Sequence, residues 1–165
     1  MITKSSQIST SKRYQLIKQC FESVLKSEGF STDGSKKSVF WRKTDDNIYH
    51  YITAWKSMRS PKYDIMVFAH SPLLDEDFES KHPDNMGCPI NGHLHSKFGV
   101  GMRNEQLFCR SEEGFIRDFN KRGAQMLVEH AVPFLDKIQT MNDLAPLITA
   151  AGTKEQLNKL LQLTS

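Results

Sequence analysis

Two histidines separated by one residue, His93 and His95, follow Cys88 in the stretch GCPINGHLHSKFGVG, residues 87–101. Side chains two residues apart in a strand share a face, so both imidazoles could approach one metal ion, as a zinc site requires. Further ligands would have to come from Cys88, His82, Asp84 or Cys109. No known metal-binding spacing connects these residues. We therefore expect no metal or other cofactor, and a metal-dependent enzyme or metal-binding protein using His93 and His95 stays an alternative.

Cys88 beside these histidines also suggests a thiol nucleophile. Such a thiol needs a pKa lowered by a helix N-terminus or a paired base, and the residues around Cys88 indicate neither. The stretch GVGMRNE, residues 99–105, lacks the Lys-Ser or Lys-Thr step of a phosphate-binding loop. The sequence identifies no catalytic residue, and we interpret Cys88 as a thiol in a loop.

An acidic run lies in the long connection between residues 72 and 89. Connections of this length are often functional or mobile. Carboxylates beside aromatic anchors speed association with a basic protein partner and make it specific. We therefore predict a partner-binding site formed by Asp75, Glu76, Asp77, Phe78, Glu79, Tyr49, Tyr51 and Trp55. A solvated loop without a binding role is the alternative.

A basic group with neighbouring aromatic residues raises the possibility of RNA binding, in which rings stack on bases and cations meet phosphates. Its members are Lys36, Lys37, Arg42 and Lys43, next to Phe40 and Trp41. The same pattern is expected of an ordinary sheet edge, where lysines discourage aggregation. We keep an RNA-binding protein as a second alternative and do not expect nucleic acid as the partner.

The composition is that of one globular domain. A chain of 165 residues can bury a core without a disulfide or metal. The formal net charge is +3, and it is unevenly spread: residues 1–43 carry nine basic and three acidic side chains, residues 44–86 four and eight. The three cysteines are widely spaced, and there is no signal peptide or long apolar run. We expect a cytoplasmic protein, frayed over residues 1–10, without a membrane partner.

The first half of the chain predicts one helix and a meander of strands. Apolar residues recur at helical spacing from Tyr14 to Leu25, with a cap at Ser9, Thr10 or Ser11 and a stop at Gly29. The stretches SVFWRK, NIYHYITAWKS and YDIMVFAHS alternate as strands do and are joined by short turns. In the second, both faces are partly apolar, as in a strand covered on each side or one that receives a partner. HLHSKFGVG, residues 93–101, is a further predicted strand.

The second half predicts helices. Ser111, followed by Glu112 and Glu113, is a good helix start. One apolar stripe of a long helix is predicted from Phe115, Phe119, Met126, Leu127, His130, Phe134 and Ile138. Pro133 removes a hydrogen bond and should kink that helix near Glu129. Short helices follow at about residues 144–150 and 154–163, so the whole chain predicts an α+β domain: an antiparallel sheet of about four strands with the N-terminal and C-terminal helices packed on one face.

Several motifs resemble those of a bacterial family of small domains of unknown function. Members pair a Leu-Lys-x-x-Gly-Phe helix end with Phe-x-Arg, as in LKSEGF and VFWRK here, and YITAWKSMRSPKYDIMVF and AVPFLDKI extend the similarity over roughly residues 12–140. The resemblance implies an α+β fold and no catalytic residue. Such domains are similar in size and architecture to immunity proteins that neutralise toxins. We therefore expect a non-enzymatic protein-binding module, with an immunity-type inhibitor of a cognate toxin as the specific hypothesis.

Overall fold

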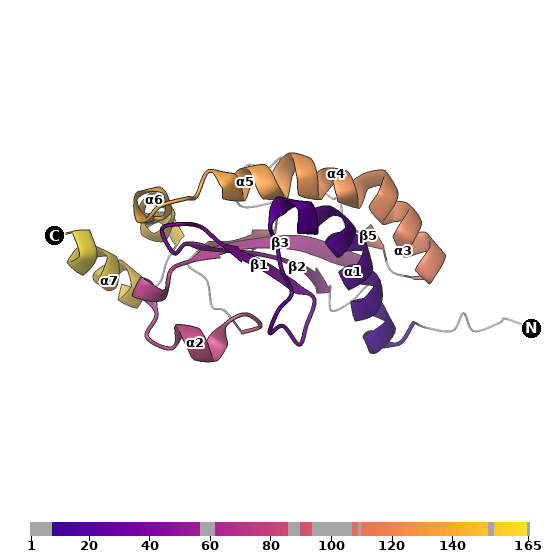
Figure 1. Cartoon of the computed structure of the whole chain (residues 1–165), viewed down its shortest axis with the longest axis horizontal. Helices are drawn as coiled ribbons and strands as arrows, with labels where there is room; N and C mark the ends of the chain where they lie inside the picture. The colour runs from indigo at the N-terminus through magenta and orange to yellow at the C-terminus, as the bar shows by residue number, and fades with distance from the viewer. Residues whose placement is uncertain are drawn as a thin grey trace, which may run out of the picture.

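A computed structural model describes residues 8–56, 62–85, 90–93, 107–108, 110–151 and 154–164. The chain forms an α+β structure with an antiparallel sheet and helices before and after it in sequence, which confirms the predicted fold class (Figure 1). Within the described ranges, no helix combines the length and the apolar character needed to cross a membrane.

The sheet is built on three antiparallel strands, β1 (Val39–Lys43), β2 (Tyr49–Lys56) and β3 (Lys62–His70), in that spatial order. Two short strands, β4 (Ile90–His93) and β5 (Leu107–Phe108), pair with the free edge of β3. The predicted meander is therefore confirmed. The further strand predicted over residues 93–101 begins earlier, at Ile90, and residues 94–101 lie outside the described part of the chain.

Side chains of β2 alternate between the two faces of the sheet. Ile52 joins the main core beneath the helices, together with Ile65 and Val67 of β3. Tyr49 and Tyr51 belong to a second apolar cluster on the opposite face, and Tyr51 is fully buried there. Of the two predicted explanations for a strand with two apolar faces, the structure supports the first: the chain itself covers both.

Helix α1 (Thr10–Leu25) begins where the sequence predicts and ends four residues before the predicted stop at Gly29. The side chain of Ser9 accepts a hydrogen bond from the backbone N–H of Lys12 and caps the helix. After a short 3₁₀ turn, η1 (Lys26–Glu28), the chain reverses at Gly29 with φ 83°. That φ lies in the left-handed region, where a residue without a Cβ is not strained. Apolar residues of α1 are buried in the main core: Leu16, Ile17, Phe21 and Leu25.

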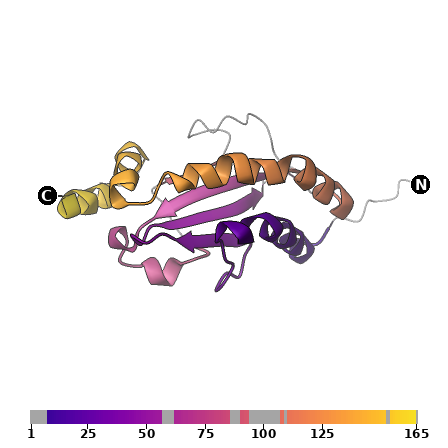
Figure 2. The same ribbon diagram turned by 45° about the horizontal axis from the view of Figure 1, so that its top comes forward.

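Residues 112–136 form one long helix with two π-helical parts. Its segments are α3 (Glu112–Asp118), η3 (Phe119–Gly123), α4 (Ala124–Met126), η4 (Leu127–Ala131) and α5 (Val132–Asp136). Figure 2 shows them as a continuous ribbon running along the sheet. The Ser111 side chain caps the start by accepting from the Gly114 N–H, as predicted. At Glu129, four residues before Pro133, where the sequence predicts a kink, the helix has its second π segment.

The buried side of this helix follows a repeat of four residues: Phe115, Phe119, Gly123, Leu127, Ala131 and Leu135. An α-helix turns about 100° per residue, so each four-residue step would drift about 40° around the axis. A π turn closes its hydrogen bond over one more residue and is therefore wider, which offsets the drift. The predicted stripe is confirmed at Phe115, Phe119, Met126, Leu127 and Ile138, which are buried in the core. His130 and Phe134, also predicted to face inward, are only partly buried, because the prediction assumed one helical period throughout.

Two further helices, α6 (Met141–Ala151) and α7 (Lys154–Thr164), close the described chain near the predicted positions. They lie beyond one end of the sheet, opposite the start of α1 (Figure 1). Leu144 of α6 and Leu160 of α7 are buried and join the main core.

The second face of the sheet is covered by residues 72–85, called the covering segment below. It contains a 3₁₀ turn, η2 (Pro72–Leu74), and one helical turn, α2 (Phe78–Lys81), which Figure 1 shows on the side of the sheet away from α3 to α5. Phe78 is buried against Val39 and Tyr51. The prediction that helices pack on one face is therefore incomplete, because both faces of β2 are apolar and each needs a cover.

A buried polar network joins the β1–β2 hairpin to the end of the long helix. Arg42 donates from Nε to His50 Nδ1 (3.1 Å) and from Nη1 to the Glu28 carbonyl (2.8 Å), and its Nη2 pairs with Asp136 (2.5 Å). Since His50 Nδ1 accepts, its Nε2 carries the proton and donates to the Ile138 carbonyl (2.6 Å). Burial of the ring is the main cause that lowers the pKa of His50 to about 4, although the Ile138 carbonyl opposes it.

This shift makes stability depend on pH. The unfolded His50 titrates near pH 6.5 and the folded one near 4, so the unfolded chain binds more protons between these values. We expect the free energy of unfolding to fall as the pH drops from 6.5 to 4, by up to ~3 kcal/mol from His50. In His50→Gln the amide can donate to Ile138 and accept from Arg42 but cannot titrate. The free energy of unfolding, measured by urea denaturation at several pH values, should therefore depend less on pH in this variant. His130→Gln is the control, and equal slopes for both variants would contradict this expectation.

Candidate protein-binding surface

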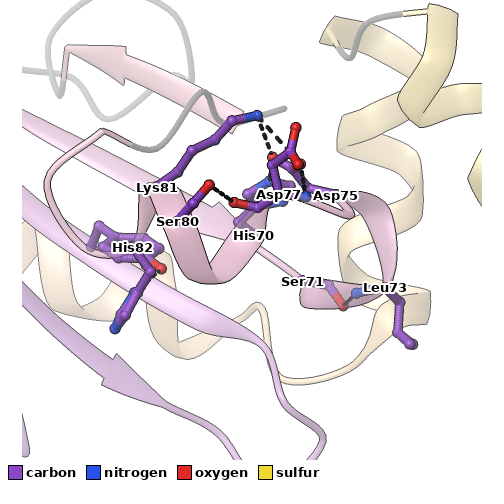
Figure 3. A network of polar contacts seen from close by, with 9 residues as sticks. His70, Ser71, Leu73, Asp75, Asp77, Ser80, Lys81 and His82 are labelled. Atoms are coloured by element: carbon purple, nitrogen blue, oxygen red, sulfur yellow. Dashed lines mark hydrogen bonds and ion pairs between the residues drawn. The ribbon is translucent and has the colours of Figure 1, made fainter.

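The covering segment begins where β3 ends. Ser71, buried after the last strand residue His70, caps η2 by accepting from the Leu73 N–H (3.3 Å). The preference of Ser for such positions comes from its short side chain, which reaches the free amides of a helical turn. Leu74 is then buried, whereas Leu73 is 61% exposed. In Figure 3 the side chain of Leu73 points away from the neighbouring polar contacts.

A polar network holds the first half of the covering segment. Both carboxylate oxygens of Asp75 accept from Lys81 Nζ, at 3.0 and 3.3 Å, and one also accepts from the Asp77 N–H at 3.0 Å (Figure 3). Burial acts to raise the pKa of Asp75, but the bonds from Lys81 and Asp77 outweigh it and the pKa is lowered. Asp75 is therefore an internal anchor of the segment rather than a free surface charge.

His70 extends this network into the protein interior. Its ring is completely buried, and burial lowers its pKa, so the imidazole is neutral at neutral pH. Nε2 lies 3.5 Å from an Asp75 oxygen, longer than a well-formed hydrogen bond, and we treat the contact as electrostatic. Nδ1 has no hydrogen-bond partner among the described residues. The ring also packs against Phe78, with centroids 5.8 Å apart.

The second half of the covering segment is held by aromatic rings and one hydroxyl. Tyr51 Oη lies 2.7 Å from His82 Nδ1. Burial lowers the pKa of His82, so its neutral ring can accept the tyrosine proton at Nδ1. Phe78 stacks on His82, and Trp41 and Tyr49 approach the same ring edge-on (4.6 and 5.2 Å between centroids). These contacts make a second small core.

A third attachment lies at the end of the covering segment. The two carboxylate oxygens of Asp84 accept from Ser35 Oγ (2.6 Å) and from the Lys36 N–H (2.7 Å), in the turn before β1. The segment is thus tied to the sheet or its loops near its start, middle and end. It is a fixed part of the surface, whereas the sequence left open whether this connection is mobile.

The predicted partner-binding residues are brought together, but they divide into two groups. Tyr51 and Phe78 are 0% and 2% exposed and serve the second core, so neither is accessible to a partner in this conformation. Tyr49 is half-buried, and Asp75 is engaged by Lys81. The side chain of Trp55 lies outside the described part. The members that face solvent are Glu76, Asp77 and Glu79.

An exposed apolar residue that the sequence analysis did not single out belongs to the same segment. Leu73 precedes the exposed carboxylates by a few residues and is the most exposed large apolar side chain described. Glu76 also lies 3.5 Å from Lys159 of α7, which brings this helix beside the covering segment. We call Leu73, Glu76, Asp77 and Glu79 the acidic patch. The exposure of Leu73 could not be predicted, because Leu73 and Leu74 are adjacent in Pro-Leu-Leu-Asp, residues 72–75, and the sequence does not indicate which of them is buried.

The histidine pair that suggests a metal site is only partly described. His93 is the last residue of β4, opposite Met66, while the position of its side chain, His95 and Cys88 lie outside the described part. Two residues considered as further ligands have other partners: His82 contacts Tyr51, and Asp84 accepts from Ser35 and Lys36. Among the described residues, no three His, Cys, Asp or Glu side chains form a metal-binding group.

The basic group considered for RNA binding does not form a stacking platform in the described structure. Phe40 is 1% exposed and belongs to the main core. Arg42 is committed to His50 and Asp136. Trp41 packs on Tyr49 and donates its indole N–H to the Asp33 carbonyl. These contacts give the aromatic and guanidinium groups a structural role.

We expect Asp75→Asn to loosen the covering segment, because the substitution removes the ionised partner of Lys81. Hydrogen exchange of the amides at His82 and Asn85, which are bonded within the segment, should speed up roughly tenfold, while amides of β2 change little. Glu79→Gln, at an exposed carboxylate of the same segment, is the control. Unchanged exchange in Asp75→Asn would show that the aromatic contacts alone hold the segment.

Comparisons of this chain with protein-family models, with curated proteins and with solved structures find no match. The similarity of LKSEGF and VFWRK to a bacterial family of unknown function therefore stays an expectation. The function has to be inferred from the described geometry, in which the acidic patch is the most exposed feature that the covering segment presents.

Proposed function

We propose that this chain is a non-enzymatic protein-binding module that contacts a basic partner through the acidic patch. The more specific hypothesis is an immunity-type inhibitor that neutralises a bacterial toxin in the cytoplasm by direct binding. One observation carries the proposal: Leu73, 61% exposed, and three exposed carboxylates that follow it within six residues belong to one segment that packs on the sheet.

Fixation of the covering segment supports a binding role because a preorganised surface loses little conformational entropy on association. The contacts of Asp75 with Lys81, of Tyr51 with His82 and of Asp84 with Ser35 already hold the backbone in one conformation. A partner would therefore meet Glu76, Asp77 and Glu79 in fixed positions. A mobile acidic loop would have to be ordered first.

The chemistry of the acidic patch favours a basic protein partner. Exposed carboxylates steer a basic partner toward the site and raise the association rate, whereas an apolar side chain among them contributes through burial. Burial raises the pKa of Tyr49, and the negative charge of Glu79 raises it further. Tyr49 is half-buried and packs on Phe78 of the covering segment, with 4.7 Å between ring centroids.

The direct test is native mass spectrometry of the tagged chain purified from its own host without chelators. A stoichiometric protein partner with a basic surface is the expected result. A lone chain with a zinc-sized mass increment would contradict the proposal and return attention to His93 and His95. A co-purifying nucleic acid would favour the RNA-binding alternative.

With a partner in hand, Glu76→Gln combined with Glu79→Gln should lower the association rate at low salt and reduce its dependence on ionic strength. The expected reduction is about threefold to tenfold, because two charges are removed from the steering field. Stopped-flow association at two salt concentrations measures this effect. The matched control is Asp45→Asn with Asp46→Asn, two exposed carboxylates in the β1–β2 turn. Equal effects of the two pairs would exclude the acidic patch from the interface.

Leu73→Ser should speed dissociation of the same complex, by roughly tenfold if the leucine is buried in the interface. The stability of the free chain should hardly change, because this side chain is mostly in solvent already. Surface plasmon resonance measures the dissociation rate. Leu163→Ser on α7 is the control at another exposed leucine. An unchanged dissociation rate for Leu73→Ser would remove the apolar contact from the proposal.

A further inference from the structure

A pocket of about 330 Å³ lies where α1 begins beside the first strand, apart from the acidic patch. Its position follows from a step in the sheet: β1 begins at Val39, opposite Thr53, so β2 continues past it from Ala54 onward. The start of α1 is tied to this step because Ser38 Oγ donates to the Tyr14 carbonyl (3.1 Å). A pocket of this volume is at the lower end of the size range of small-molecule sites.

Arg13 is the unusual member of the pocket lining. Its guanidinium carries five N–H donors, and no hydrogen bond or ion pair to it is found within the described residues. The Nε atom is shielded from solvent and lacks a partner there. Shielding one N–H donor from water without an acceptor has a cost, although Arg13 as a whole is only partly buried. An acceptor from outside the described structure would remove this cost.

The other charged groups leave the pocket positive. Lys37 lines it and its side chain is exposed. Asp84, the acidic member of the lining, has both oxygens occupied by Ser35 and Lys36. The pocket lining thus has two positive side chains, Arg13 and Lys37, and one carboxylate, which already accepts hydrogen bonds from other donors. This excess of positive charge favours an anionic ligand group.

The rest of the lining selects a ligand with an apolar body. Tyr14 from α1, Val39 from β1 and Phe68 from β3 contribute rings and an aliphatic surface, and Tyr63 is buried beneath them. A bare inorganic anion would leave these side chains without contact. A planar carboxylate also matches the fork of an arginine better than it matches a lysine.

We propose that this pocket binds a small organic acid, with its carboxylate on Arg13 and Lys37 and its apolar body against Tyr14, Val39 and Phe68. This site is independent of the proposed protein-binding function. The failure of one leaves the other standing, because the acidic patch and the pocket share no residue.

Phenylacetate is a suitable probe, with phenylacetamide as its uncharged equivalent and inorganic phosphate as an anion without an apolar body. Each is titrated to roughly 10 mM, which covers the affinities of small fragments, into the ¹⁵N-labelled full chain followed by NMR. We expect saturable shifts of amides around Arg13 and Val39 with phenylacetate. The amide and phosphate should give at least about tenfold weaker responses.

Arg13→Gln should weaken phenylacetate binding about tenfold or more while the thermal midpoint changes little, because the Arg13 guanidinium has no hydrogen-bond partner to lose among the described residues. Lys37→Gln, at an exposed position, is the second variant and should weaken binding without affecting folding. Lys18→Gln, exposed on α1 outside the pocket, is the matched control. Absence of binding to the unaltered chain, equal binding by Arg13→Gln and Lys18→Gln, or phosphate binding as strong as that of phenylacetate would each overturn the proposal.

Discussion

The structure depends on one constraint: the central strand β2 is apolar on both of its faces. Ile52 on one face and Tyr51 on the other are both 0% exposed. A sheet with two apolar faces needs a layer on each side, since uncovered apolar area costs about 25 cal/mol per Å². Helix α1 and the long helix supply one layer. The connection after β3 has to supply the other, so it runs back across the sheet instead of taking a short path.

This constraint decides what the covering segment can offer a partner. Its aromatic residue Phe78 and the tyrosine below it are used inside the molecule, and the carboxylate of Asp75 is used to hold Lys81. What remains outside is the acidic patch. The same contacts that remove side chains from the surface also fix the ones that stay there. Stability and preorganisation of the segment therefore have a common origin.

Much of the fold can be predicted from the sequence because local signals and burial agree. Ser9 marks the start of α1 and Gly29 the end of the 3₁₀ turn that follows it, both through capping chemistry, and the alternation in β2 gives its two faces correctly. The roles of Tyr51, Phe78 and Asp75 could not be predicted, because an aromatic or acidic residue looks the same in sequence whether its partner is another protein or the same chain. The contacts that decide it join residues far apart, such as Tyr51 and His82.

The proximity of Arg13 and Lys37 at the pocket could not be predicted from the sequence either. Lys37 belongs to a group of basic residues that the sequence analysis names, but Arg13 lies in a helix among ordinary polar neighbours. Only the step between β1 and β2 brings the two to one cavity. Charge in sequence indicates a candidate site, and sheet topology decides which charges meet.

The four-residue repeat of the long helix limits how this part of the chain can change. Its outer side, which includes Val128 and Glu129, is exposed and can accept many substitutions. A deletion of one residue within η3 would leave ordinary α-helical turns there, with Leu127 seven residues after Phe119 instead of eight. Seven residues at about 100° each complete two turns to within about 20°, so Leu127, Ala131 and Leu135 would still face the sheet. A deletion within α3 or α5 lacks this compensation and would rotate the helix on one side of it by about 100°. Single-residue deletions in related sequences should therefore fall within residues 119–131 rather than elsewhere in this helix.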